Sequence, residues 1–386
     1  MFDFILKNGL LTDPASGWDA SKQDIAVQDG VIAEIAPEIH GDAKNVVDLN
    51  GLTVTPGLID FHAHFYSGGT NTSLEFSSYL PTGVTHAVDA GSAGDSNVES
   101  FLSALTPRER RHTDVFVNLA SEGLSCLGEH PENIDPRFFN GEKLLRLCRR
   151  YPREIRGLKL RISGEIAEYS GTTSFDALRA AVRIAERCGL PLSVHMPNFQ
   201  GELNELLDIL RPGDIFCHVF TPQKGIGAAD GGIDPEVFRG REKGIIFESA
   251  CGKGHLGHQV ASAAIARGFL PDVISGDLTR NTFGNLPAVS LPWLMSRFLA
   301  MGMSFADVLA AVTTTPARIL GREGEIGCLA VGSNADIAVF HRRQGTFVFN
   351  DVRSAAVTGR ELLVPCATML EGEWVYNQLP YLQQSC

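Results

Sequence analysis

The sequence predicts an α/β protein, namely a closed (β/α)₈ TIM barrel that carries a small β-sandwich domain formed from both termini. The barrel is predicted because eight short apolar segments alternate with amphipathic helical patterns within residues 55–325. The sandwich is predicted because residues 1–54 and 326–386 both contain short stretches of alternating polarity bounded by turn sequences.

Charge and composition narrow the functional classes. The 386 residues include 33 basic and 45 acidic side chains, a net charge of −12 that argues against nucleic acid or an anionic membrane as partner. Nothing approaches the ~18 apolar residues of a membrane span. The eight cysteines form no CxxC pair, and the N-terminus does not resemble a signal peptide. We therefore expect a cytoplasmic homo-oligomer that acts on a small molecule.

Short strands are expected at both ends of the chain. They fall at residues 2–9, 23–37, 44–51, 332–343, 345–350, 352–362 and 367–377. Asp29-Gly30 and Asn50-Gly51 are typical hairpin turns, so hairpins are predicted around both.

The barrel strands are expected at the eight apolar segments. These are residues 58–64, 83–91, 114–123, 155–164, 190–198, 214–222, 244–252 and 272–279. Between them, residues 203–210 place four leucines on one helical face, and another helix is predicted from a Ser174 cap to Gly189. No GxGxxG follows the first strand, which argues against dinucleotide binding.

Two histidines end the first barrel strand. Because strand side chains alternate, Asp60, His62 and His64 are predicted to share one face. Phe61 and Ala63 are predicted to face the helix layer. Two imidazoles spaced in this way can reach a single metal ion, although an isolated histidine is more often structural.

Lys159 lies in the fourth strand, where alternation predicts that it points into the barrel. An unpaired ammonium there is costly to bury. A carboxylate partner, a Schiff-base role or conversion to a carbamate by carbon dioxide would relieve that cost, and the side chain could also extend to the rim.

Three further polar residues lie near the C-terminal ends of later strands, namely His195, His218 and Asp277. Active sites of (β/α)₈ barrels form at that end. The convergence of polar groups from five strands there predicts a metal centre.

These residues resemble the amidohydrolase superfamily. TPGLIDFHAH is similar to its PGxIDxHxH signature, Lys159, His195, His218 and Asp277 follow in the expected order, and GSNADIAVF is similar to its C-terminal sandwich sequence. HFYSGGT, GVTHAVDAGSAG and ARGFLPDVISGDLTRN are similar to the amidohydrolase/deacetylase metallohydrolase branch, near dihydroorotases and D-aminoacylases.

The resemblance implies a binuclear zinc site, with Mn²⁺ or Co²⁺ as possible substitutes. His62, His64 and Asp277 would hold one ion, His195 and His218 the other, and N6-carboxylated Lys159 would bridge the two. Asp277 would also be the catalytic proton carrier. The expected activity is hydrolysis of an N-acyl amino acid or an acetylated 2-hydroxy acid.

Substrate recognition is expected from side chains just beyond the strand ends. The candidates are Tyr66, Arg161, Ser163, Lys253, His255 and Arg280. The chain departs from the branch after the seventh strand, where ACGKGHLGH puts Cys251 in place of an expected histidine and adds Lys253 and His255.

Three alternatives remain open at this point. A dihydroorotase or hydantoinase would have the same metal ligands, but Tyr66 stands where a dihydroorotase usually has arginine. A mononuclear deaminase would lack Lys159 and carry a glutamate shortly after His195, where HMPNFQ has none. A non-catalytic scaffold would have lost metal ligands, whereas all six positions are filled.

Overall fold

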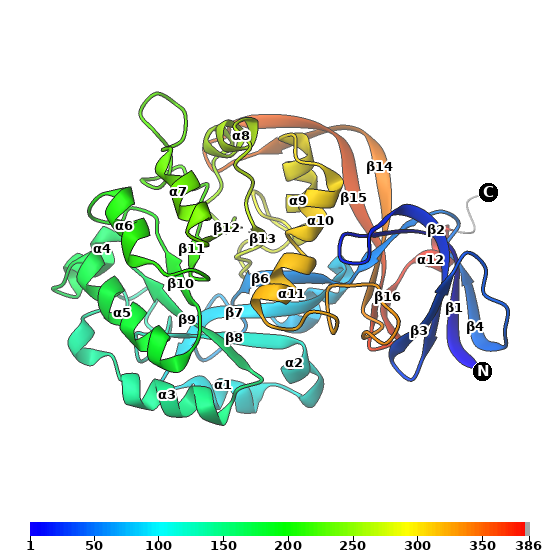
Figure 1. Cartoon of the computed structure of the whole chain (residues 1–386), viewed down its shortest axis with the longest axis horizontal. Coiled ribbons are helices and arrows are strands. Elements are labelled where there is room, and N and C mark those ends of the chain that lie inside the picture. The colour runs from blue at the N-terminus through cyan, green and yellow to red at the C-terminus, as the bar shows by residue number, and fades with distance from the viewer. Residues whose placement is uncertain (383–386) are drawn as a thin grey trace.

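Residues 1–382 are described in a computed structural model that contains two eight-stranded β-sheets (Figure 1). One sheet is built from the middle of the chain, and the other from both termini. The prediction of a (β/α)₈ barrel with a terminal strand-rich unit is confirmed.

The central sheet is the barrel. Its parallel strands are β6 (Leu58–Ala63), β7 (Val84–Gly94), β8 (Thr113–Asn118), β9 (Ile155–Arg161), β10 (Leu192–His195), β11 (Ile215–Cys217), β12 (Ile246–Ala250) and β13 (Val273–Ser275). They pair in sequence order, and a bridge between Ala63 and Leu278 brings the last strand back to the first. Asp60 supports this closure, because its carboxylate accepts a hydrogen bond of 2.8 Å from the Gly276 amide.

Helices follow most barrel strands. They are α1 (Val98–Ala104), α2 (Pro107–Arg111), α3 (Gly141–Arg150), α4 (Gly164–Tyr169), α5 (Ser174–Cys188), α6 (Leu203–Ile209), α7 (Glu236–Glu242), α8 (His258–Ala266), α9 (Leu291–Ala300), α10 (Phe305–Ala310) and α11 (Thr314–Ile319). A further helix, α12 (Leu379–Leu382), follows the last strand of the terminal sheet. Thr173 caps α5, not Ser174 as predicted: the Thr173 hydroxyl accepts from the Asp176 amide, while Ser174 donates to the Ile162 carbonyl. Within residues 1–382, every helix is too short or too polar to cross a bilayer.

The terminal sheet has its own apolar core. Its strands are β1 (Phe2–Asp13), β2 (Trp18–Gln28), β3 (Val31–Ala36), β4 (Ala43–Asp48), β5 (Thr53–Pro56), β14 (Ile337–Asn350), β15 (Ala356–Leu370) and β16 (Glu373–Asn377). Asp29-Gly30 closes the predicted β2–β3 hairpin. The hairpin predicted at Asn50-Gly51 is wrong, because β4 and β5 both pair in parallel with β1.

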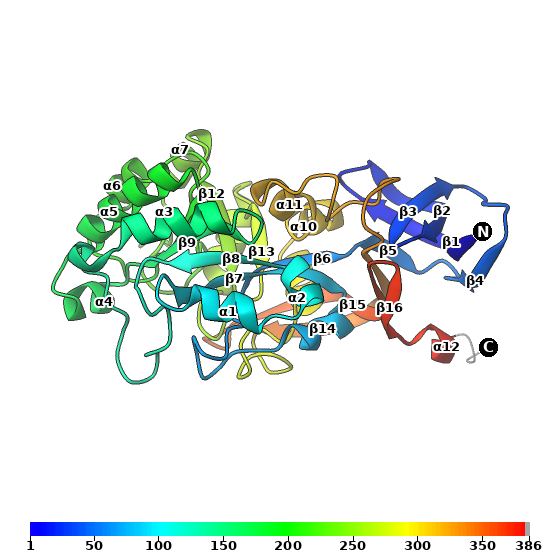
Figure 2. The same ribbon diagram turned by 90° about the horizontal axis from the view of Figure 1, so that it is seen from below.

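The hairpin of β14 and β15 belongs to the terminal sheet and packs against helix α9 of the barrel. Residues 332–343 and 345–350, expected as separate strands, lie largely in the continuous strand β14. Its outer half runs along the barrel (Figures 1 and 2). There the Leu363 amide donates to Ser296 Oγ at 3.0 Å, and Phe349 contacts Trp293 with ring centroids 4.8 Å apart.

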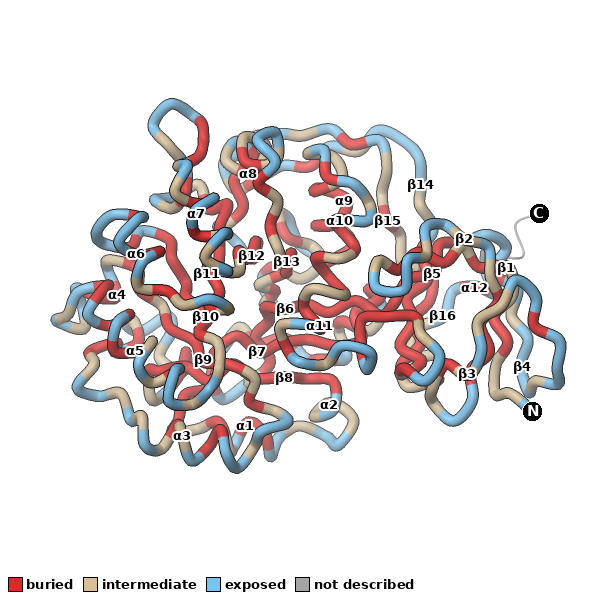
Figure 3. Tube along the Cα trace, in the orientation of Figure 1, coloured by how far each residue is buried: buried red, intermediate tan, exposed pale blue. Residues whose placement is uncertain are grey.

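The lower interior of the barrel is apolar. Phe61 was expected to face the helices, but it packs on Phe116 with ring centroids 5.5 Å apart, in a cluster that also contains Val88 and Val273 from other strands. The reason is a register shift between Asp60 and Ala63, which interrupts the alternation of β6. Figure 3 shows the barrel strands almost continuously buried.

We predict that Gly157→Ala lowers the free energy of unfolding by about 1–3 kcal/mol, because overpacking a full core forces its neighbours apart. A Cβ at Gly157 would lie 2.6 Å from the Phe116 ring. Urea unfolding followed by circular dichroism measures the change. Gly254→Ala is the control, since a Cβ there meets nothing within 4 Å. Equal stability of the two variants would contradict this packing.

Candidate metal centre

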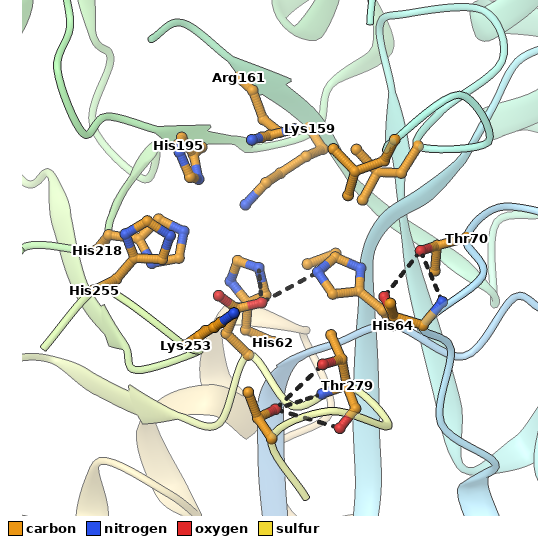
Figure 4. A pocket seen from close by; sticks show the side chains of 16 residues that line it. His62, His64, Thr70, Lys159, Arg161, His195, His218, Lys253, His255 and Thr279 are labelled. Atoms are coloured by element: carbon orange, nitrogen blue, oxygen red, sulfur yellow. Dashed lines mark hydrogen bonds and ion pairs between the residues drawn. The ribbon is translucent and has the colours of Figure 1, made fainter. Parts of the chain in front are cut away.

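A cavity of about 190 Å³ opens at the C-terminal ends of the barrel strands (Figure 4). Its lining is dominated by polar and ionisable side chains. The lining residues are His62, His64, Thr70, Thr72, Ala90, Leu124, Leu127, Lys159, Arg161, His195, His218, Lys253, His255, Asp277, Thr279 and Thr282. All six predicted metal ligands are therefore brought together in one place.

The first ligand group consists of His62, His64 and Asp277. Oδ1 of Asp277 lies 3.6 Å from Nε2 of His62 and 3.2 Å from Nε2 of His64. Asp277 has a left-handed backbone with φ of 46°, and its amide donates to the His62 carbonyl at 2.7 Å. Such a conformation is unfavourable for a non-glycine residue, and residues held in it are enriched at active sites and ligand-binding sites.

The electrostatics of this group suit a cation. Burial raises the pKa of Asp277, but the imidazoles of His62 and His64 outweigh it and leave that pKa below its usual value. Burial and then the Lys159 ammonium lower the pKa of His62. A carboxylate therefore faces a neutral imidazole, and both are the protonation states that bind metal.

A second group consists of His195, His218 and His255. The ring centroids lie 4.5 Å apart for His195 and His218, 5.1 Å for His195 and His255, and 4.2 Å for His218 and His255. Burial lowers the pKa of all three rings, which favours their neutral form, and the Asp277 carboxylate opposes this effect at His255. Nδ1 of His218 donates to the Ala250 carbonyl at 3.0 Å, which leaves Nε2 free to bind a cation.

Lys159 points into the cavity between the two groups (Figure 4). Its side chain is buried, and Nζ lies 3.3 Å from Ser193 Oγ and 3.7 Å from Cys217 Sγ. Gly91 makes room for it, since a Cβ there would lie 2.7 Å from Lys159 Cγ. Both of these contacts are with uncharged side chains.

Sequence reasoning missed Glu248 on β12. Both its carboxylate oxygens lie 3.4 Å from Nδ1 of His62, and Oε1 also accepts from Ser275 Oγ at 2.6 Å. Burial raises the pKa of Glu248, but His62 outweighs it, so the group is a carboxylate. The available signal was a single charged residue in a strand of otherwise uncharged residues.

The six predicted substrate-binding residues divide into two sets. Arg161, Lys253 and His255 line the cavity. Tyr66, Ser163 and Arg280 lie elsewhere: the Tyr66 ring packs on Phe101 with centroids 5.0 Å apart, Ser163 is buried at the start of α4, and Arg280 is exposed. None of these three side chains lines the cavity.

The loop that follows β12 explains the departure noted at Cys251. Cys251 is buried, with Sγ 3.5 Å from Nη1 of Arg297, and burial raises the pKa of its thiol to about 11. It is thus a neutral side chain behind the cavity. The histidine that reaches the ligand groups from this loop is His255.

The donor set fits divalent cations. The ligand atoms of His62, His64 and Asp277 lie within 4.8 Å of one another, and so do those of His195, His218 and His255. Imidazole nitrogen with carboxylate oxygen is the donor combination of zinc and similar transition metals. Two adjacent groups give room for two ions.

Comparisons with known proteins agree with this geometry. The profile of the Amidohydrolase family matches residues 272–375. A deacetylase of Agrobacterium fabrum is 33% identical over 331 residues, covering 84% of this chain and 79% of the relative. A deacetylase of Brucella anthropi is 32% identical over 328 residues, covering 83% and 80%. The crystal structure of a dihydroorotase matches with a TM-score of 0.87 at 29% identity, covering 97% of each chain.

We predict that Glu248→Gln weakens zinc binding about 10–100-fold, because a carboxylate that orients a ligand histidine and strengthens its basicity is lost. Calorimetric titration of chelator-treated protein with Zn²⁺ measures the affinity. Ser249→Ala is the matched control, since it is the next residue of the same strand. An unchanged affinity in Glu248→Gln would show that His62 does not need its carboxylate neighbour.

Proposed function

This chain belongs to the amidohydrolase superfamily, and we propose that it is a binuclear, metal-dependent hydrolase that cleaves the amide or ester bond of a small acylated substrate. The similarity to two deacetylases supports the hydrolase class. The observation that carries the proposal is the convergence of two ligand groups around Lys159 in one cavity.

We assign His62, His64 and Asp277 to one ion and His195 and His218 to the other. Zinc is the proposed metal, with Mn²⁺ or Co²⁺ as substitutes, because nitrogen and carboxylate oxygen ligands suit these ions. Lys159 would bridge the ions after its neutral amine adds to carbon dioxide and releases a proton. The resulting carbamate replaces a buried cation with an anion beside two dications, which favours its formation.

The bound ions would supply the Lewis acidity that activates water and polarises the scissile carbonyl. Asp277, being ionised, can accept the proton of the attacking water on a carboxylate oxygen and then donate it to the leaving amine or alkoxide. Glu248 would hold the ring of His62 in position during these steps, since it contacts Nδ1 and leaves Nε2 facing Asp277.

The size and charge of the cavity favour a small anionic substrate. Its volume of about 190 Å³ accommodates only a few heavy atoms beyond the reacting group. Lys253 is exposed at the cavity and can pair with a carboxylate, whereas Arg161 already pairs with Glu132 at 3.0 Å. An N-acyl amino acid or an acetylated 2-hydroxy acid combines an acyl group with such a carboxylate.

Hydrolysis of a cyclic amide is the second candidate. It is favoured by the structural likeness to a dihydroorotase at 29% identity, and it would use the same ligand groups. The side chain of Tyr66, which packs on Phe101, offers no guanidinium for a substrate carboxylate. Assays with N-acyl amino acids, acetyl esters and dihydroorotate distinguish these activities.

We predict about two equivalents of zinc in protein purified without chelators, and a sharp fall in Lys159→Ala, because the bridging ligand is removed. Elemental analysis measures the content. Lys22→Ala, which changes an exposed lysine of β2, serves as the control. If wild-type protein contains only trace metal, and if added zinc and bicarbonate do not raise its metal content, the binuclear mechanism is refuted.

Asp277→Asn should lower kcat by about 10²–10⁴-fold, because the proton carrier is lost. The loss should be larger for an N-acetyl amino acid than for the matching acetyl ester, since an amine is the poorer leaving group without protonation. Steady-state assays at equal zinc content separate this effect from metal loss. Equal losses for both substrates would argue against proton donation by Asp277.

A further inference from the structure

We propose that His255 is a metal ligand that completes the second ion site together with His195 and His218. This inference rests on the proposed function, because it concerns a cation bound in the same cavity. This role differs from the sequence-based prediction, which placed His255 among the substrate-binding residues because of its position in a loop beyond a strand end. Each ion would then have three protein side chains of its own, with Lys159 shared between them.

The proposal follows first from the geometry of three rings. The ligand atoms of His195, His218 and His255 all lie within 4.8 Å of one another. Each ring neighbours both others, at centroid separations between 4.2 and 5.1 Å. In Figure 4 the rings of His218 and His255 lie side by side, with His195 close to both. A cation that binds two of these imidazoles is within reach of the third.

A second observation is an unsatisfied atom. Nδ1 of His255 is buried and has no hydrogen-bond partner among the described residues. A buried nitrogen without a partner costs free energy comparable to a lost hydrogen bond. Coordination of a cation by this imidazole would offset that cost by adding a favourable interaction to the ring.

The loop backbone holds the ring in place. The amide of His255 donates to the Cys251 carbonyl at 2.9 Å, and the Gly257 amide donates to the Phe220 carbonyl at 2.9 Å. Leu256 is buried between these two anchors. Backbone hydrogen bonds on both sides therefore fix the position of His255 in the loop. A ligand that is fixed in this way belongs to a site that is formed before the metal binds.

The balance of ligands supports the same conclusion. Counting the shared Lys159, one ion would have four side chains, those of His62, His64, Asp277 and Lys159, while the other would have three without His255. A catalytic zinc ion takes three protein ligands plus water and can take further ligands. His255 would make the two sites equal in number of ligands, and it comes from the loop in which this chain differs from the expected branch sequence.

The test is zinc titration of chelator-treated full-length protein by calorimetry. Wild type should bind about two ions. His255→Asn should bind one of them as before and the other at least about 100-fold more weakly, because the loss of a direct ligand weakens metal binding at least as much as the loss of a residue that only orients a ligand. His255→Asp has nearly the same shape as His255→Asn but carries a carboxylate that can bind a cation, so it should recover part of the zinc affinity. His341→Asn, which changes an exposed histidine of β14, should match wild type.

The outcomes separate the two proposals. Wild-type protein that binds fewer than two ions overturns the binuclear function. If wild type and His255→Asn both bind two ions with equal affinity, only the proposal that His255 is a metal ligand is overturned. A raised KM in that variant would then make His255 a substrate contact.

A measurement on wild type covers the case in which His255→Asn does not fold. Of the chain's 11 histidines, zinc should shift the ring ¹⁵N signals of His255 and the four assigned ligand histidines in NMR spectra. A His255 ring signal that does not respond to saturating zinc overturns the proposal.

Discussion

Ionisable side chains buried at the mouth of the barrel must find polar partners in one another, and the rest of the structure depends on this constraint. An uncompensated buried charge costs several kcal/mol. Glu248 meets the requirement through its contacts with His62 and Ser275, and Asp277 through its contacts with His62 and His64. Burial makes these contacts necessary, because an isolated buried charge would lower the stability of the fold. Burial also lowers the pKa of His195, His218 and His255, and neutral imidazoles can bind a cation.

The barrel interior is accordingly divided into two layers. An apolar layer around Phe61 and Phe116 fills the end nearer the start of the strands, and the polar layer rests upon it. The register shift in β6 links the layers, because it lets Phe61 point into the core while His62, its neighbour, reaches the cavity. Left-handed backbone at His218 and Asp277 completes the arrangement beyond the strand ends.

Much of this could be predicted from periodicity. The eight barrel strands and the convergence of His62, His64, Lys159, His195, His218 and Asp277 follow from alternation and from the location of strand ends. The orientation of Phe61 could not be predicted, because a bulge depends on partner strands and leaves no local signature. Neither could the proximity of His255 to His195, since a loop path is set by contacts such as Gly257 to Phe220.

The pairing of β5 with β14 has a consequence for how the protein is made. Pro56 and Ile337, which are neighbours in the finished sheet, are far apart in the chain. At ~5–20 residues per second, a ribosome needs roughly 15–60 s between them. During that interval the N-terminal strands expose an unpaired edge, which is a template for aggregation. The nascent chain thus depends on protection, by its own barrel or by a chaperone, until its last strands emerge.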